Sequence, residues 1–175
     1  MSGCVVWLTG LPASGKSTIA AATCSVLRAR HLECVTLDGD DVRKALVPAP
    51  GYDPRARAQF YETLARLAAL LADQDAIVLV AATAHLRRFR DNARTLAPAF
   101  LEVFVDTPLA ECKRRDPKGL YSGYSTDLVP GVGTVYEPPE RPDFVVRPDT
   151  RDAALRLATL IIEQGGQHDQ KARFG

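Results

Sequence analysis

The chain has 175 residues, of which 46% are hydrophobic and 25% are charged, close to the average for soluble globular domains. Lysine and arginine number 22 against 21 acidic residues, so the net charge is only +1, which argues against a nucleic-acid-binding protein or a polybasic membrane-surface protein. A chain of this length predicts about one domain. We expect that domain over residues 1–164 and a flexible, polar, glycine-containing tail over residues 165–175.

The cysteines and the apolar runs bear on where the protein works. Cys4, Cys24, Cys34 and Cys112 are scattered and form no CxxC pair. The sequence shows no secretory signal, and its longest apolar run, residues 76–82, is far shorter than the roughly 20 residues that cross a bilayer. We therefore expect free thiols in a cytoplasmic protein with no membrane segment.

Short apolar runs alternate along the chain with longer segments of helical period. The predicted strands are residues 5–9, 34–37, 76–80, 101–105 and 144–146, and the predicted amphipathic helices are 17–30, 55–73, 86–96 and 152–163. Thr107 and Pro108 are expected to be the N-cap and first residue of a further helix. This alternation predicts an α/β fold with a parallel sheet and helices on both faces.

One long segment, residues 116–143, breaks the alternation. It shows little periodicity and is rich in proline and glycine. Such a segment in a compact domain is usually functional or disordered. Because it also contains Tyr121, Tyr124 and Tyr136, we predict that it is a lid over an active site.

A phosphate-binding loop is predicted at residues 10–17. The sequence Gly10-Leu11-Pro12-Ala13-Ser14-Gly15-Lys16-Ser17 matches GxxxxGK[ST] and lies between a predicted strand and a predicted helix. In such loops the backbone N–H groups and the helix N-terminus converge on phosphate oxygens. We expect this loop and Thr18 to bind ATP, with Lys16 on the β- and γ-phosphates and Ser17 on Mg²⁺.

A group of charged residues follows the second predicted strand, namely Asp38, Asp40, Asp41 and Arg43. Ligands of open α/β sheets bind where strands end, so these side chains are expected beside the triphosphate. One carboxylate can hold a metal-bound water while another orients or deprotonates an incoming hydroxyl. We predict Asp38 as a metal ligand and Asp38, Asp40 and Lys16 as catalytic residues. The structural alternative is that Asp40 or Asp41 only caps the following short helix.

At this point the chain resembles the adenylylsulfate kinases. The resemblance covers residues 4 to about 150, and its motifs are WLTGL at 7–11, LDGD at 37–40, VFVDTPL at 103–109, RDPKGLY at 115–121 and VYE at 135–137. It implies a P-loop nucleoside-triphosphate hydrolase-type fold with three layers, a five-stranded parallel sheet and a lid. It also implies transfer of the γ-phosphoryl group of ATP to the ribose 3′-hydroxyl of adenylyl sulfate, a small-molecule nucleotide acceptor, and association as a homodimer.

The resemblance also implies roles for individual residues. Asp38 and Asp40 match carboxylates at the metal and the acceptor hydroxyl, and Arg43 and Arg57 match arginines that bind the acceptor's phosphosulfate. Tyr52 replaces a phenylalanine that stacks on the acceptor's adenine, and both side chains offer a flat aromatic face. Matches at the mouth of the nucleotide site and at the start of the lid are Arg115, Lys118, Leu120 and Tyr121.

Departures from the family pattern are concentrated on the acceptor side. Of the family's Asp-Arg-x-x-Asn motif only Arg57 is present, and Thr83-Ala84-His85 stands in place of Ile-Ser-Pro. Either Tyr124, Arg87 or Arg88 supplies the missing contacts, or the acceptor is a different one. Two alternatives therefore stay open: a kinase for another nucleotide-linked molecule, such as a cytidine diphosphate conjugate, and an inactive nucleotide-binding module. For His85, a proton-shuttling role and a hydrogen-bonded loop role are both open.

Overall fold

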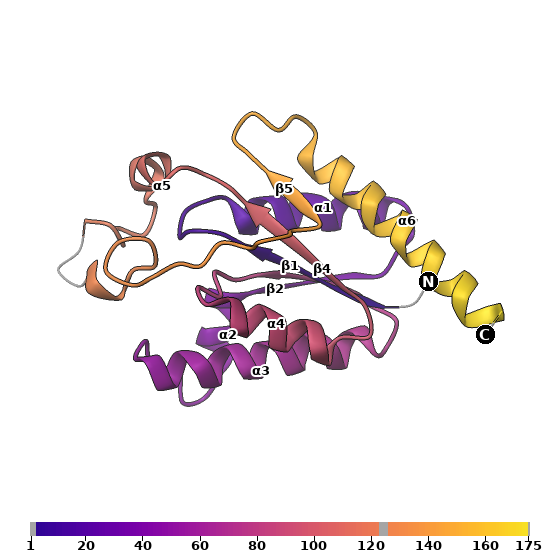
Figure 1. Cartoon of the computed structure of the whole chain (residues 1–175), viewed down its shortest axis with the longest axis horizontal. Helices are drawn as coiled ribbons and strands as arrows, with labels where there is room; N and C mark the ends of the chain where they lie inside the picture. The colour runs from indigo at the N-terminus through magenta and orange to yellow at the C-terminus, as the bar shows by residue number, and fades with distance from the viewer. Residues whose placement is uncertain (1–2, 123–125, 175) are drawn as a thin grey trace.

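The computed structural model describes residues 3–122 and 126–174, which form an α/β domain (Figure 1). Its central parallel sheet has the strand order β2-β3-β1-β4-β5. The strands are β1 (Cys4–Thr9), β2 (Cys34–Asp38), β3 (Ile77–Ala81), β4 (Phe100–Val105) and β5 (Phe144–Val146). All five strands predicted from the apolar runs are confirmed.

Helices cover both faces of this sheet, so the predicted three-layer arrangement is confirmed (Figure 1). On one face lie α1 (Lys16–Ala29) and α6 (Ala153–Phe174), and on the other α3 (Pro54–Ala72) and α4 (Arg87–Leu96). Successive side chains of a strand point to opposite faces. The central strand β1 therefore places Leu8 in one core and Trp7 in the other, both fully buried.

The register of the sheet brings three strand ends to one level. Ala81 of β3 is paired with Leu8 of β1 on one side and with Asp38 of β2 on the other. The segments that leave these ends are the phosphate-binding loop after β1, the short helix α2 (Gly39–Ala45) after β2 and residues 82–86 after β3. The sheet therefore brings the phosphate-binding loop and the predicted residues Asp38, Asp40 and Arg43 to its carboxyl edge.

The lid segment, residues 116–143, extends from the carboxyl edge after α5 (Leu109–Arg115) (Figure 1). Its described residues are mostly irregular and include one short 3₁₀-helix, Thr126–Leu128. The described part of this segment therefore has the irregular backbone that its low periodicity indicates. Tyr124 lies outside the described residues.

Two expectations about helix ends are wrong. The N-cap of α5 is Pro108, because the Thr107 hydroxyl instead donates to the carbonyl oxygen of Ser14 at 2.8 Å. The last helix does not end at residue 163 but continues as α6 to Phe174, through most of the range expected to be a tail. The pair Gly165-Gly166 lies inside it, since a glycine in a helix costs only about 0.5–1 kcal/mol.

The four cysteines are free, and all four are buried, which confirms the expectation of free thiols. Burial raises the pKa of the Cys4 thiol to about 12. Within residues 3–122 and 126–174, we find no helix whose length and apolar character would let it span a membrane.

Candidate active site

The phosphate-binding loop makes a tight turn between β1 and α1. Gly10 and Gly15 have φ angles of 155° and 102°, in the region that favours glycine. A Cβ atom on Gly10 would lie 2.5 Å from the carbonyl oxygen of Val105, so this position also requires glycine for space. Gly15 is the N-cap of α1 and has no side chain to satisfy the first N–H groups of the helix. These N–H groups are therefore suited to bind an anion.

The Lys16 ammonium group is buried within this loop. Its Nζ donates to the carbonyl oxygens of Leu11 at 2.8 Å and of Gly10 at 3.1 Å. Burial lowers the pKa of Lys16 to about 8, against the opposing effect of the nearby Asp40 and Asp38 carboxylates. A phosphate in the loop would favour the charged lysine and raise this pKa again.

Ser17 and Asp38 lie together where α1 begins and β2 ends. The Ser17 hydroxyl donates to Oδ2 of Asp38, and Oδ1 of Asp38 accepts from the backbone N–H of Asp40 at 2.9 Å. Asp38 is thus the N-cap of α2, and the alternative that Asp40 or Asp41 caps this helix is wrong.

The same pair of side chains suits a magnesium ion. A hydroxyl and a carboxylate are the hard oxygen ligands that Mg²⁺ prefers, and Mg²⁺ often takes only one or two ligands from the protein beside phosphates and waters. The described residues contain no group of three or more His, Cys, Asp or Glu side chains placed to hold a metal.

Asp40 forms an ion pair with Lys118, which comes from the start of the lid segment. About half of each side chain is exposed. The hydrogen bond to Asp40 raises the pKa of Lys118. We expected Lys118 at the mouth of the nucleotide site. In the structure it pairs with Asp40, the carboxylate predicted to interact with the acceptor hydroxyl.

Other residues near the start of the lid contact the phosphate-binding loop. The Tyr121 hydroxyl donates to the carbonyl oxygen of Pro12 at 2.8 Å, and Arg115 Nη1 donates to that of Ser14 at 3.5 Å. The Asp116 carboxylate accepts from the backbone N–H groups of Leu120 and Tyr121 and so fixes this turn. The Leu120 side chain is 42% exposed.

The predicted acceptor residues come together beside α2 and α3. The Arg43 guanidinium lies between two aromatic rings, with Cζ 4.4 Å from the Tyr52 centroid and 3.9 Å from that of Phe60. It also donates to the carbonyl oxygens of Pro50 and Gly51 at 3.0 and 2.7 Å. Arg43 therefore fixes the loop that carries Tyr52, a contact that the sequence did not indicate.

Arg57 is the second buried cation of this region. Its Nε donates to the carbonyl oxygen of Tyr52 at 2.6 Å, and its Nη2 donates to that of Leu128 in the lid segment. Among the described residues, neither Arg43 nor Arg57 has a carboxylate partner within ion-pair distance. Two buried guanidinium groups bonded to carbonyls and aromatic rings make this region suitable for an anionic ligand.

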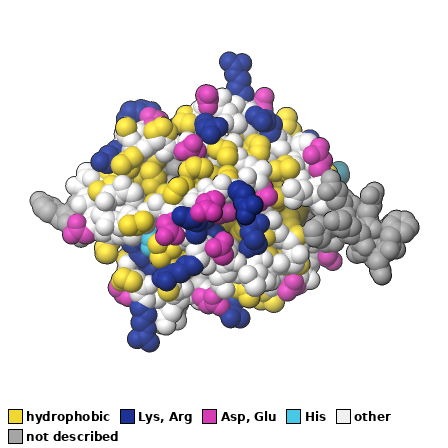
Figure 2. Space-filling model, viewed as in Figure 1, with side chains coloured by type: hydrophobic (Ala, Val, Ile, Leu, Met, Phe, Trp, Pro, Cys, Tyr) yellow, Lys and Arg dark blue, Asp and Glu magenta, His cyan; other side chains and the backbone are white. Residues whose placement is uncertain are grey.

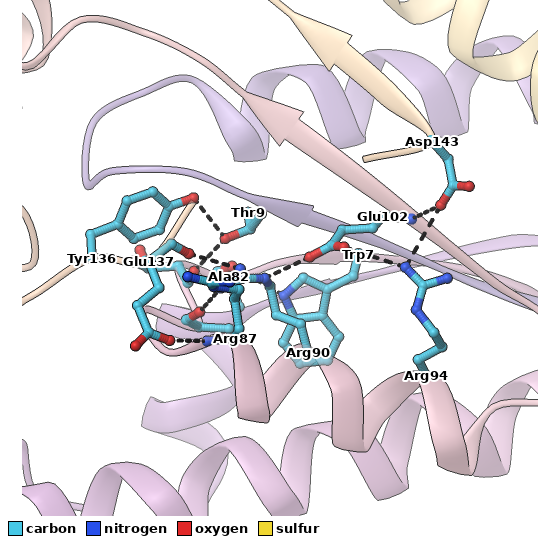
Figure 3. Close-up of polar contacts among 12 residues, drawn as sticks. Trp7, Thr9, Ala82, Arg87, Arg90, Arg94, Glu102, Tyr136, Glu137 and Asp143 are labelled. Atoms are coloured by element: carbon cyan, nitrogen blue, oxygen red, sulfur yellow. Dashed lines mark hydrogen bonds and ion pairs between the residues drawn. The ribbon is translucent and has the colours of Figure 1, made fainter. Parts of the chain in front are cut away.

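A buried arginine that sequence reasoning missed joins four parts of the site. Arg90 of α4 is 1% exposed, and its Nε donates to Glu102 of β4 at 2.6 Å. Its Nη1 and Nη2 donate to the carbonyl oxygens of Ala84, after β3, and Glu137, in the lid segment, at 2.6 and 2.8 Å (Figure 3). The signal in the sequence is its spacing of four residues from Leu86 and three from Ala93, which places it on the buried face of the helix.

The far end of the lid segment is bonded to the end of β1. The hydroxyl groups of Tyr136 and Thr9 lie 3.1 Å apart, and Thr9 in turn donates to the carbonyl oxygen of Thr83 at 2.6 Å (Figure 3). Burial raises the pKa of Tyr136 to about 12. The Tyr136 hydroxyl therefore keeps its proton at neutral pH and serves as a hydrogen-bonding group.

The two arginines considered as replacements for missing acceptor contacts differ in their surroundings. Arg87 pairs with Glu140, and its backbone N–H donates to the Glu137 carboxylate at 2.8 Å. Arg88 is exposed and lies over the ring of Phe89, with Cζ 5.2 Å from the centroid. On the face shown in Figure 2, acidic and basic side chains are interspersed and do not form one basic patch.

Known proteins resemble this chain over nearly its whole length. The family described as adenylylsulphate kinase matches residues 2–147, a range that contains all five strands and the lid segment. The adenylyl-sulfate kinase of Pseudomonas aeruginosa is 39% identical over 163 residues, covering 90% of this chain and 83% of that protein. That of Saccharomyces cerevisiae is 37% identical over 168 residues, covering 92% and 83%. The Mycobacterium tuberculosis APS kinase CysC, solved in complex with AMPPNP and APS, has a TM-score of 0.82 and 36% identity over 93% of this chain and 96% of that one.

Proposed function

This chain belongs to the adenylylsulfate kinase family, and from that membership we propose that it phosphorylates adenylyl sulfate with ATP. The γ-phosphoryl group passes to the ribose 3′-hydroxyl, so that a new P–O bond forms, the bond to the β-phosphate oxygen breaks, and ADP and 3′-phosphoadenylyl sulfate are released. The convergence of Lys16, Asp38 and Asp40 at one sheet edge, in a chain of this family, is the observation that supports the proposal.

The phosphate-binding loop binds ATP. Its backbone N–H groups and the N-terminus of α1 surround the phosphates, and Lys16 exchanges its carbonyl partners for phosphate oxygens. Ser17 and Asp38 would hold Mg²⁺, which when bound neutralises charge on the phosphate oxygens. Positioning and electrostatic stabilisation account for most of the rate of phosphoryl transfer, so these contacts carry much of the catalysis.

The acceptor binds beside α2 and α3. The buried cations Arg43 and Arg57 attract its phosphosulfate, and the half-exposed ring of Tyr52 offers a stacking face to its adenine. Asp40 accepts the proton of the 3′-hydroxyl as the new bond forms. Because Asp40 is bonded to Lys118 in this structure, the hydroxyl must take the place of the lysine or share the carboxylate with it.

The lid segment excludes water from the transferred phosphoryl group. It is bonded to the phosphate-binding loop through Tyr121 and to the end of β1 through Tyr136. Water in an open site would compete with the acceptor and hydrolyse ATP. Contacts at both ends of the segment therefore support a role in closing the site.

The family match favours adenylyl sulfate over a cytidine-linked acceptor. The presence of the phosphate-binding loop, Asp38 and Asp40 in one place argues against an inactive module. Mg²⁺ as the ion, a homodimer as the assembly, the absence of nucleic-acid or membrane partners and a cytoplasmic location remain predictions of the proposal. Activity titrated with EDTA and MgCl₂, and mass measured by light scattering, test the first two.

The test is a steady-state assay of ADP release with adenylyl sulfate as acceptor, with the product identified by mass spectrometry. Matched reactions contain AMP, which lacks the sulfate, or a cytidine diphosphate conjugate. We expect adenylyl sulfate to give 3′-phosphoadenylyl sulfate and the highest kcat/KM. ADP release that depends on the cytidine conjugate, or on no acceptor at all, would contradict the proposal.

A further inference from the structure

His85 is a buried histidine for which the fold provides no complete set of partners. It follows β3 at the carboxyl edge of the sheet and is 6% exposed. Its Nδ1 has no hydrogen-bond partner, and among the side chains described in residues 3–122 and 126–165 it is the only buried nitrogen or oxygen in this condition. Buried polar atoms are nearly always paired, so an unpaired one needs an explanation.

The backbone around His85 is held firmly in an uncommon conformation. Ala84 has a φ of 40°, in the left-handed region that residues other than glycine rarely adopt. Its carbonyl oxygen accepts from Arg90 at 2.6 Å, and the carbonyl oxygen of His85 accepts from the backbone N–H of Glu137 at 2.7 Å. Such conformations persist where surrounding contacts enforce them, and they are concentrated at functional sites.

The surroundings of the His85 ring contain two aromatic rings and several charged groups. Its centroid lies 5.5 Å from that of Phe89 and 6.1 Å from that of Tyr61. The titratable and charged groups that face it are Arg57 and Tyr61 of α3, Arg88 and Arg90 of α4, and Glu137 of the lid segment. Burial, and then the charges of Arg57 and Arg88, lower the pKa of His85 to about 4. The ring is therefore neutral at pH 7, with one N–H donor and one acceptor nitrogen.

We propose that His85 is a specificity-determining residue that donates a hydrogen bond from Nδ1 to the anionic end of the acceptor, beside Arg57. The inference rests on the proposed function. An anion is the group that the nearby guanidinium of Arg57 would attract, and a neutral imidazole can add a directional N–H donor without a further buried charge. An apolar side chain at this position would fill the aromatic pocket equally well but would leave the anion oxygen without this donor.

Three substitutions at one position separate the contact from its alternatives. His85→Asn places an amide near the position of Nδ1, whereas His85→Gln places its amide near the position of Nε2. His85→Leu fills the pocket with no polar atom. Because a hydrogen bond to a charged group is lost, we expect His85→Leu and His85→Gln to raise the KM for adenylyl sulfate about 10- to 100-fold. His85→Asn should restore it to within a few-fold of wild type, and the KM for ATP should stay within about twofold in all three.

The thermal midpoint of unfolding of His85→Leu distinguishes a binding role of His85 from a purely structural one, because the two roles predict changes in opposite directions. Replacing a buried atom without a partner by an apolar group removes a desolvation penalty. We therefore expect His85→Leu to unfold at the same temperature as the wild type or higher, while binding the acceptor more weakly. A histidine kept for packing would instead give a lower midpoint.

The outcomes distinguish the inference from the proposed function. Wild-type turnover of adenylyl sulfate with an unchanged acceptor KM in His85→Leu overturns the inference and leaves the function standing. The same holds if His85→Leu raises the KM for both substrates and lowers the unfolding temperature. If the wild type does not phosphorylate adenylyl sulfate, the function fails, and the inference fails with it.

Discussion

Lys118, near the start of the lid segment, donates a hydrogen bond to the carboxylate of Asp40, in the first turn of α2. One ion pair therefore connects the lid segment to the carboxylate that we assign to the acceptor hydroxyl. Both side chains are about half exposed, so the pair is weak enough to exchange partners when a substrate arrives. The position of Lys118 and the availability of the Asp40 carboxylate are thereby linked.

Substitution of Asp40 tests its role in proton transfer. We expect Asp40→Asn to bind a non-hydrolysable ATP analogue normally and to lose about 100-fold or more in kcat, the usual scale of a lost general base. Asp41→Asn is the matched control, because Asp41 is an exposed neighbour whose carboxylate pairs with Lys44. Steady-state kinetics and calorimetric titration measure the two quantities. An unchanged kcat in Asp40→Asn would remove Asp40 from the mechanism.

The lowered pKa of Lys16 predicts proton uptake when a nucleotide binds. Burial lowers the pKa to about 8, so above this pH the lysine has lost much of its charge, and phosphate oxygens must draw a proton back. Affinity for an ATP analogue should therefore be nearly constant below pH 8 and fall above it, by at most about tenfold per pH unit. Titration calorimetry at pH 7 and pH 9, in two buffers of different ionisation enthalpy, measures both effects. Equal affinity and no proton uptake at pH 9 would contradict this.

The low pKa of His85 predicts a loss of stability in mild acid. The unfolded histidine protonates near pH 6.5 and the folded one only near pH 4, so between these values the unfolded chain binds more protons. The contribution of His85 to stability is present above pH 6.5 and is lost as the pH falls toward 4. From pH 7 to pH 5 it amounts to roughly 2 kcal/mol. Urea unfolding should show a smaller decrease over this range for His85→Leu than for the wild type, and equal decreases would exclude the effect.

The ion pair of Arg90 and Glu102 predicts a large loss of stability when one partner is removed. Arg90→Met leaves the nearly buried Glu102 carboxylate without its main partner and frees the carbonyl oxygens of Ala84 and Glu137. We expect a loss of about 3–5 kcal/mol in the free energy of unfolding. Arg94→Met is the control, because its partly exposed side chain contacts Glu102 at 3.3 Å, and it should lose about 1 kcal/mol or less. A loss below that of Arg94→Met would contradict the assigned role of Arg90.

The sequence was sufficient to predict the layers of this fold and the glycine-dependent turn between β1 and α1. Strands buried on both faces leave continuous apolar runs, and the phosphate-binding loop needs glycine at fixed positions for conformation and space. Each of these two patterns lies within a short stretch of consecutive residues, so it can be recognised without knowledge of the tertiary structure. Asp38 and Ser17 could also be placed together, because the carboxyl ends of parallel strands share an edge.

The parts that the sequence did not predict depend on contacts between distant segments. Thr107 is a residue type favoured at helix N-caps and is followed by a proline, but its hydroxyl donates to the carbonyl oxygen of Ser14 in the phosphate-binding loop. Arg57 bonds to Leu128 in the lid segment, and Arg90 bonds to three separate segments. Arginines usually lie in solvent, so their burial at these positions follows from the tertiary fold and not from residue type.

The burial of all four cysteines makes alkylation a measure of unfolding in this protein. Alkylating reagents attack the thiolate, and all four thiols are buried. Burial also raises the pKa of Cys4, Cys34 and Cys112, which disfavours their thiolates. Native molecules should therefore incorporate iodoacetamide only when the domain opens, at a rate set by its opening equilibrium. A bound nucleotide should slow the incorporation, so mass-spectrometric counting of labels would report ligand binding without any assay of turnover.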